Sequence, residues 1–112
     1  MLGYYRVKMT VHGIAHITGG GLAENLERIL PEGSRAIIER GSWTVPPVFG
    51  WMQRLGEIDQ AEMDQVFNLG IGLVLVVSPF YAESIRHQLA DCGVESFTIG
   101  RIIAGERGVT MT

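Results

Sequence analysis

The chain has little of several features that would narrow its function at once. Its single cysteine, Cys92, excludes an internal disulfide framework and fits a reducing compartment. The longest apolar run, residues 71–77, is too short to cross a bilayer, and the first residues have no apolar segment typical of a cleavable signal peptide. The net charge is only −3, without a basic cluster. We therefore expect a cytoplasmic protein that binds neither nucleic acid nor a membrane.

Side chains with metal-binding or nucleophilic chemistry are also few. No pair of histidines or carboxylates has metal-ligand spacing, so no metal site is expected, and no Ser-His-Asp set can be assembled. Of the three histidines, His87 is expected to be solvated on the polar side of a helix. His16 precedes a glycine-rich turn by three residues and is the candidate acid or base, with a structural, hydrogen-bonded histidine as the alternative.

The length and the composition describe one small globular domain. The 112 residues leave room for a single core, and 46% hydrophobic with 19% charged residues is ordinary for a globular chain. Helices and strands are mixed along the sequence without repeats or a linker. This mixture predicts an α+β fold, a layered α/β sandwich with a mixed sheet.

Helix signals occur at four places. The spacing of apolar residues predicts a helix over residues 22–30, and proline at 46 or 47 opens a second one. Asp59 and Glu62 form a capping box for the third, and residues 78–79 begin a fourth that ends at Gly93. Trp51 lies at helical spacing and is expected in the core. Trp43 is expected to be a lid over the core, with a contact to a further lobe as the alternative.

Strand signals complete the pattern. Apolar residues alternate from Tyr5 to Val11, which is typical of a half-buried strand, and residues 35–39, 97–103 and 109–112 are further candidates. The continuous apolar run of residues 73–77 predicts a strand that is covered on both faces. Before it, Gly70 and Gly72 permit the close approach of a ligand or of another backbone.

The most informative segment is AHITGGGLAENLERI at residues 15–29. Its three glycines stand between a short strand and an amphipathic helix, and glycine adopts positive φ at little cost. Backbone N–H groups and the start of the helix would then hold a phosphate or carboxylate, with help from the Thr18 hydroxyl. Asn25 lies at the edge of the apolar stripe, where it either reaches a cleft or is solvated. The alternative for the whole segment is a tight turn without a ligand.

Three segments in order carry a resemblance: AHITGGGLAENLERILPEG, GSWTVPPVFGWMQRLGEI and EMDQVFNLGIGLVLVV. They resemble the C-terminal domain of the aminoimidazole ribonucleotide synthetases, also called phosphoribosylformylglycinamidine cyclo-ligases, which act in purine biosynthesis. The resemblance covers residues 11–112 as one domain and leaves residues 1–10 as an unmatched N-terminal segment. Members of the family carry a further N-terminal half that binds Mg-ATP, and no equivalent of it occurs in this sequence.

The resemblance implies a function. The family converts formylglycinamidine ribonucleotide and ATP to aminoimidazole ribonucleotide, ADP and phosphate, and this chain would form the cleft wall opposite the ATP-binding half. It implies His16 as the catalytic residue. The implied substrate- and phosphate-binding residues are Thr18, Gly19, Gly20, Gly21, Asn25, Asn68 and Gly70.

The resemblance also implies partners. They are the ribonucleotide and the N-terminal ATP-binding half, with a homo-oligomer as a further candidate. Mg-ATP would belong to the full-length enzyme, so the chain alone is expected to bind no cofactor and to be inactive. The alternative function, of a different class, is a stand-alone, non-catalytic ribonucleotide-binding, anion-binding or interaction domain.

Overall fold

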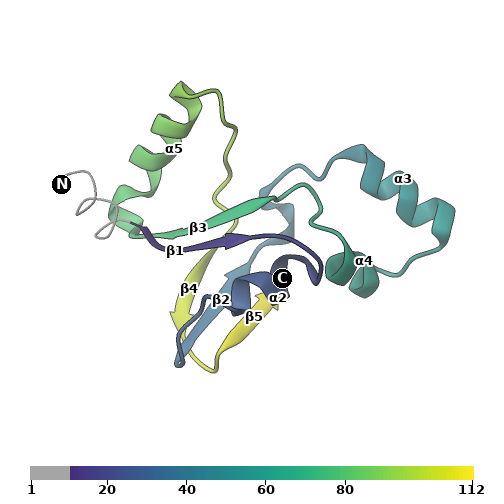
Figure 1. Cartoon of the computed structure of the whole chain (residues 1–112), viewed down its shortest axis with the longest axis horizontal. Coiled ribbons are helices and arrows are strands. Elements are labelled where there is room, and N and C mark those ends of the chain that lie inside the picture. The colour runs from purple at the N-terminus through teal and green to yellow at the C-terminus, as the bar shows by residue number, and fades with distance from the viewer. Residues whose placement is uncertain (1–10) are drawn as a thin grey trace.

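A computed structural model describes residues 11–112. Five strands are present in this part of the chain: β1 (Val11–His16), β2 (Ser34–Ile38), β3 (Leu73–Val77), β4 (Gly100–Ala104) and β5 (Gly108–Met111). Four α-helices accompany them: α2 (Gly21–Glu27), α3 (Pro47–Gly56), α4 (Gln60–Val66) and α5 (Ala82–Asp91). Two short 3-10 helices, η1 (Arg40–Ser42) and η2 (Pro79–Tyr81), complete the set (Figure 1). The half-buried strand is predicted to run from Tyr5 to Val11, and its residues before Val11 lie outside the described part of the chain.

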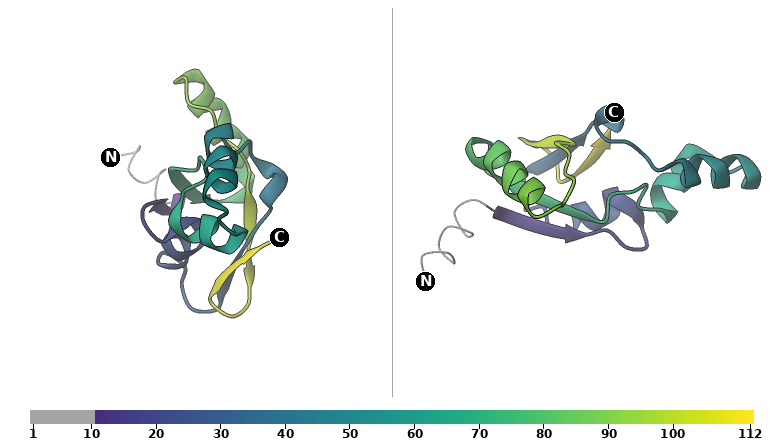
Figure 2. Two further views of the ribbon diagram at one scale, coloured as in Figure 1. Left: turned by 90° about the vertical axis from the view of Figure 1, so that its right-hand side faces the viewer. Right: turned by 90° about the horizontal axis from the view of Figure 1, so that it is seen from above.

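The strands form two sheets. β1 pairs antiparallel with β3, and β2 lies between β4, its antiparallel neighbour, and β5, its parallel neighbour. Figure 2 shows the two sheets on opposite sides of the body of the molecule. The predicted α+β sandwich with a mixed sheet is therefore confirmed.

The core lies between the two sheets and takes in one face of α2. Leu22 and Leu26 of α2 pack in one cluster with Ala15 of β1, Ala36 of β2 and Val74 of β3. Burial of these apolar side chains is the main favourable contribution to the fold. The burial of Leu22 and Leu26 also explains the apolar stripe that predicted this helix.

Trp43 covers one end of the core. Its side chain is buried, and its indole Nε1–H donates a hydrogen bond to the Leu69 carbonyl oxygen at 3.2 Å. A buried indole N–H needs such a partner. The prediction of a lid over the core is confirmed.

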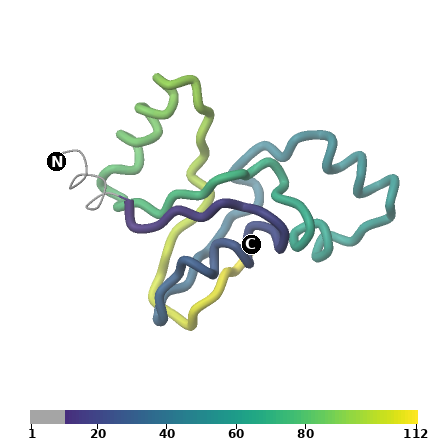
Figure 3. The backbone as a smooth tube through the Cα atoms, viewed as in Figure 1, coloured from purple at the N-terminus to yellow at the C-terminus, as the bar shows by residue number. Residues whose placement is uncertain are grey.

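The prediction that Trp51 lies in the core is wrong. α3 begins at Pro47 as predicted, but it has no buried residue, and 56% of Trp51 is exposed. The helix is held to the rest of the chain on its other side, where the ring of Phe49 meets the ring of Phe67 edge to face at 5.8 Å. Figure 3 shows α3 and α5 extending away from the body in different directions.

The prediction for residues 73–77 is half wrong. The strand forms, but only Val74 is buried, and 58% of Leu73 is exposed. β3 pairs only with β1, and neither the second sheet nor a helix buries its other face within the described residues. This face of the strand is therefore exposed at Leu73 and half-buried at Leu75 and Val77.

Helix and strand ends follow the local chemistry closely. The Asp59 carboxylate accepts a hydrogen bond from the Glu62 backbone N–H at 2.8 Å, which confirms the predicted cap of α4. The segment after Ser78 first makes η2, so α5 begins only at Ala82, and Gly93 ends it with φ of 78°. β4 begins at Gly100 rather than at the predicted residue 97.

Candidate functional site

The glycine-rich segment forms a tight turn between β1 and α2. Gly20 and Gly21 have φ values of 101° and 77°, a region that side-chain-bearing residues rarely adopt. The Gly21 N–H donates to the Thr18 carbonyl oxygen at 3.1 Å and closes the turn. A Cβ atom on Gly21 would overlap the backbone carbonyl of Asp64 in α4. The predicted positive φ is thus confirmed at Gly20 and Gly21, and Gly21 also allows α2 and α4 to pack closely.

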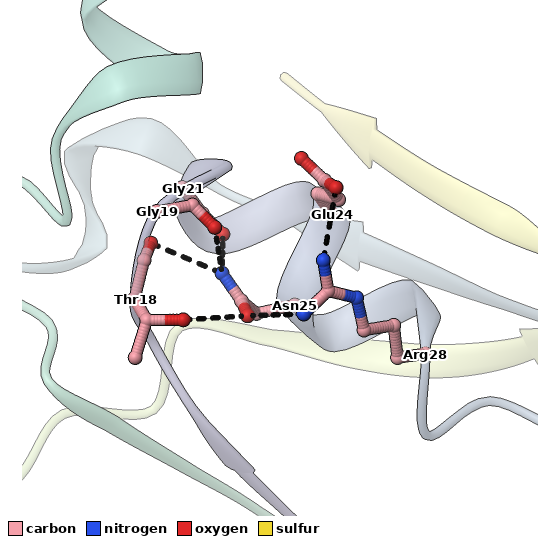
Figure 4. A network of polar contacts seen from close by, with 6 residues as sticks. All are labelled: Thr18, Gly19, Gly21, Glu24, Asn25 and Arg28. Carbon is pink, nitrogen blue, oxygen red and sulfur yellow. Dashed lines mark hydrogen bonds and ion pairs between the residues drawn. The ribbon is translucent and has the colours of Figure 1, made fainter.

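Asn25 organises this turn from below (Figure 4). The side chain is buried, and its Nδ2 donates to the carbonyl oxygens of Gly21 at 2.7 Å, Thr18 at 3.1 Å and Gly19 at 3.4 Å. Its Oδ1 accepts from the Thr18 hydroxyl at 3.2 Å. A solvated position for Asn25, one of the two sequence-based alternatives, is therefore wrong. The amide fixes the turn by satisfying three carbonyl groups at once.

Two backbone N–H groups of the turn are available as donors. Within residues 11–112, the N–H groups of Gly19 and Gly20 have no hydrogen-bond acceptor. The Glu24 carboxylate lies beside Gly20, so close that a Cβ atom on Gly20 would overlap it. Glu24 is paired with Arg28 at 3.0 Å on the surface of α2. An anion at the turn would meet two free donors and one neighbouring negative charge.

A groove of about 600 Å³ opens beside the turn, between α2, α4 and β5. It reaches Gly20 and carries charges of both signs, among them Arg35 and Arg107. Both guanidinium groups are already engaged: Arg35 donates to the Thr110 hydroxyl at 2.7 Å, and Arg107 donates to the Leu30 carbonyl oxygen at 2.8 Å. Sequence reasoning missed these arginines, because nothing local to Arg107 signals a contact with a residue 77 positions away.

The remaining predicted residues lie on the other side of the turn. His16 is the last residue of β1 and is exposed. Asn68 accepts a hydrogen bond from the Gly70 N–H at 2.9 Å, and the approach that Gly70 permits is that of the Pro46 ring. The Ile17 N–H donates to the Gly72 carbonyl oxygen at 2.9 Å, which brings residues 68–72 alongside the entry to the turn. Within the described residues, hydrogen bonds therefore join the predicted residues in two separate groups, the turn with Asn25 and the pair Asn68 and Gly70.

An ion pair supports the turn from behind. The Arg40 guanidinium donates to Asp64, with 2.9 Å between Nη1 and Oδ1, and Gln60 donates to the same carboxylate at 2.9 Å. Hydrogen bonding from Arg40 lowers the pKa of Asp64 below its ordinary value, although burial opposes the shift, and Asp64 in turn raises the pKa of Arg40. Because the Asp64 backbone contacts Gly21, this pair fixes the segment against which the turn rests.

Two features are absent from the described residues. Residues 11–112 contain no group of three or more His, Cys, Asp or Glu side chains that could hold a metal ion. No helix in this part of the chain combines the length and the apolar character that a bilayer crossing requires. Cys92 is exposed and free.

Comparison with known sequences identifies the family. The family described as "AIR synthase related protein, C-terminal domain" matches residues 6–111. The chain therefore belongs to this family and is similar to its C-terminal domain. It is 48% identical over 101 residues to the phosphoribosylformylglycinamidine cyclo-ligase of Symbiobacterium thermophilum, and 52% identical over 99 residues to that of Pseudothermotoga lettingae. These matches cover 90% and 88% of this chain but only 29% of each relative.

Comparison with solved structures agrees on the fold. The thiamine-monophosphate kinase from Stenotrophomonas maltophilia K279a aligns with a TM-score of 0.68 at 17% identity, over 95% of this chain and 33% of that one. HypE of E. coli, a hydrogenase maturation protein, aligns with the same TM-score at 21% identity, over 98% of this chain and 34% of that one. At such low identity these likenesses concern the fold alone.

Proposed function

We propose that this chain forms one wall of the substrate cleft in a phosphoribosylformylglycinamidine cyclo-ligase. In that role the glycine turn takes the phosphate of formylglycinamidine ribonucleotide or the phosphoryl group that ATP transfers. The observation that carries the proposal is the identity of about half over nine-tenths of the chain to enzymes of that name. The turn geometry supports it, because the backbone N–H groups of Gly19 and Gly20 have no acceptor among residues 11–112.

The proposed reaction divides the work between two parts. ATP activates the amide oxygen of the ribonucleotide by phosphorylating it, and ADP leaves. An amidine nitrogen then attacks the carbon that bears this oxygen, and phosphate leaves as the imidazole ring closes. Mg²⁺ would neutralise the phosphates of ATP. Because this chain covers only 29% of the length of two of its cyclo-ligase relatives, we assign the Mg-ATP site to the portion that it does not span. The chain alone is expected to be inactive.

The roles of single residues follow from their positions. The Gly19 and Gly20 N–H groups bind the phosphate. The exposed Thr18 hydroxyl already donates to Asn25, so it holds the turn and reaches the phosphate only by giving up that bond. Asn25 keeps the turn in shape through its three carbonyl contacts. His16 reaches the cleft from the end of β1 and orients a polar group of the substrate, or exchanges a proton with it. Asn68 and Gly70 line the same cleft.

An amide NMR titration of the chain tests the proposal. Formylglycinamidine ribonucleotide should give saturable shifts at residues 18–25, inorganic phosphate should give weaker shifts at the same amides, and Mg-ATP without the ribonucleotide should give neither pattern. Shifts elsewhere, or none at these amides, would contradict the proposed site.

A pair of matched variants sharpens the test. A Cβ atom at Gly19 or at Gly41 meets no neighbour within 4 Å, and neither residue has positive φ. Gly19→Ala adds a methyl group to the turn itself and should weaken ribonucleotide binding. Gly41→Ala carries the same change in a distant loop and should bind as the unaltered chain does. Equal affinities for the two variants would count against the turn as the binding element.

A further inference from the structure

The sheet of β1 and β3 has one face on the core and one face open. Ala15 pairs with Val74 on the core side, and both are buried. On the opposite side Ile14 pairs with Leu75, and His16 pairs with Leu73. We call this second side the outer sheet face and define it by Ile14, His16, Leu73, Leu75 and Val77.

The outer sheet face has the composition of a buried surface. Four of its five residues are apolar. Leu75 and Val77 are half-buried, yet 55% of Ile14 and 58% of Leu73 are exposed, so the open part of the face lies at the His16 end. A strand with apolar residues on both sides is typical of a sheet that is covered on both faces. α5 follows β3 closely along the chain but has no buried residue, and it leaves Leu73 and Ile14 exposed. A contiguous apolar patch of this kind marks an interaction surface.

We propose that the outer sheet face is the docking surface for polypeptide from the portion of the cyclo-ligases that lies outside the match. That portion is large, because this chain covers only 29% of the length of two of its relatives. The occupant would be a layer with its own apolar side chains, in the way that helices cover the faces of sheets in layered α/β folds. It would belong to the same polypeptide or to a separate chain that supplies the same portion.

The size of the face argues against a second copy of this chain as the occupant. A stable interface between two proteins takes about 20–30 residues a side, whereas the outer sheet face has five. A layer that is tied to the rest of the protein does not pay the full loss of translational and rotational freedom, so a small face suffices for it. The face therefore suits a covering layer within one assembly better than a self-association surface.

The location of the face connects it with the glycine turn. His16 ends the face, and Thr18 begins the turn two residues later. A layer on the outer sheet face would therefore reach His16 and stand beside the free N–H groups of the turn. This inference rests on the proposed function, since it names the surface through which the other part of the enzyme meets this wall of the cleft.

Thiol reactivity at two adjacent positions tests the inference. Leu73→Cys and Val74→Cys are each made in a Cys92→Ser background, because Cys92 is exposed and would react. They are studied in the chain itself and in a full-length chimera, in which the chain replaces the matching segment of the Pseudothermotoga lettingae cyclo-ligase. In the chain, Leu73→Cys should react with a thiol reagent at least about tenfold faster than the core-facing Val74→Cys. In the chimera the two rates should lie within about threefold of each other.

Two results would overturn the inference. One is a rate ratio that remains as large in the chimera as in the chain, which would show that the face stays open. The other is a loss of Leu73→Cys reactivity in the chain itself as its concentration rises, which would make a second copy the occupant. Glu32→Cys, in an exposed turn, is the control and should react alike in both proteins. No ligand is present, so the result is independent of whether the glycine turn binds phosphate.

Discussion

Replacing Glu24 by glutamine should strengthen phosphate binding at the glycine turn. The carboxylate lies beside Gly20, so it repels any anion that the Gly19 and Gly20 N–H groups hold. Glutamine has nearly the same shape and no charge. The change therefore removes the repulsion and leaves the donors in place.

The magnitude follows from distance and screening. An anion on these N–H groups would lie about 5–7 Å from the carboxylate, where two unit charges in bulk water interact by about 0.7 kcal/mol. Half of the Glu24 side chain is exposed and Arg28 pairs with it, so the environment is close to water and the repulsion is partly offset. We expect a gain of about 0.3–0.7 kcal/mol, which is about a two- to threefold lower dissociation constant.

The assay is a titration of the ¹⁵N-labelled chain with inorganic phosphate, followed at the amides of Gly19 and Gly20. Glu27→Gln is the matched control, because Glu27 lies almost one turn further along α2 and carries the same charge. Its effect should be smaller and should vanish first as the salt concentration rises. If Glu24→Gln binds phosphate no better than Glu27→Gln, the turn is not where the anion lies.

Three further predictions concern stability. Gly21→Ala should cost about 2–4 kcal/mol in chemical denaturation, because it combines positive φ with a clash against Asp64, whereas Gly33→Ala has the same φ problem in open space and should cost about 1 kcal/mol. Similar costs for both would remove the close-packing argument. Asn25→Asp should destabilise the chain more than Asn25→Ala, because a carboxylate has no N–H for the three carbonyl groups and repels them; the reverse order would refute this role. Because the pKa of Asp64 is lowered in the fold, the ionised carboxylate stabilises the fold at pH values above the ordinary aspartate pKa of about 3.9. That stability is lost as the pH falls through the folded-state pKa. Arg40→Met should therefore flatten the pH dependence of the unfolding midpoint in the acid range. An unchanged slope of the midpoint against pH would mean that groups other than Asp64 cause this dependence.

Local signals in the sequence were sufficient for most elements. Pro47 at the start of α3, the Asp59 cap of α4 and Gly93 after α5 each act within a few residues, so the pattern alone locates them. Trp51 shows the limit of the same reasoning. Helical spacing of apolar residues predicts that something covers them, but it does not say whether the cover lies within the chain. The same holds for Leu73.

The candidate site was predicted in outline only. The glycine turn follows from three consecutive glycines, and its positive φ values were foreseeable. The burial of Asn25 was not, because its three partners are backbone carbonyls that become available only when the turn has closed. The support that Arg40 gives through Asp64 joins residues 24 positions apart, and no local pattern reports such a contact.

The position of β2 between β4 and β5 also has a kinetic consequence. Both neighbours are distant along the chain: Arg35 hydrogen-bonds to Thr110 across 75 residues, and Arg101 hydrogen-bonds to Glu39 across 62. β1 and β3 also lie far apart along the chain, since Val11 pairs with Val77. Closing loops of that size costs entropy before any contact repays it, so neither sheet has an early local hairpin and folding should be slow. Until both sheets have paired, the apolar strand β3 is exposed, and the yield of folded protein depends on how quickly these distant strands meet.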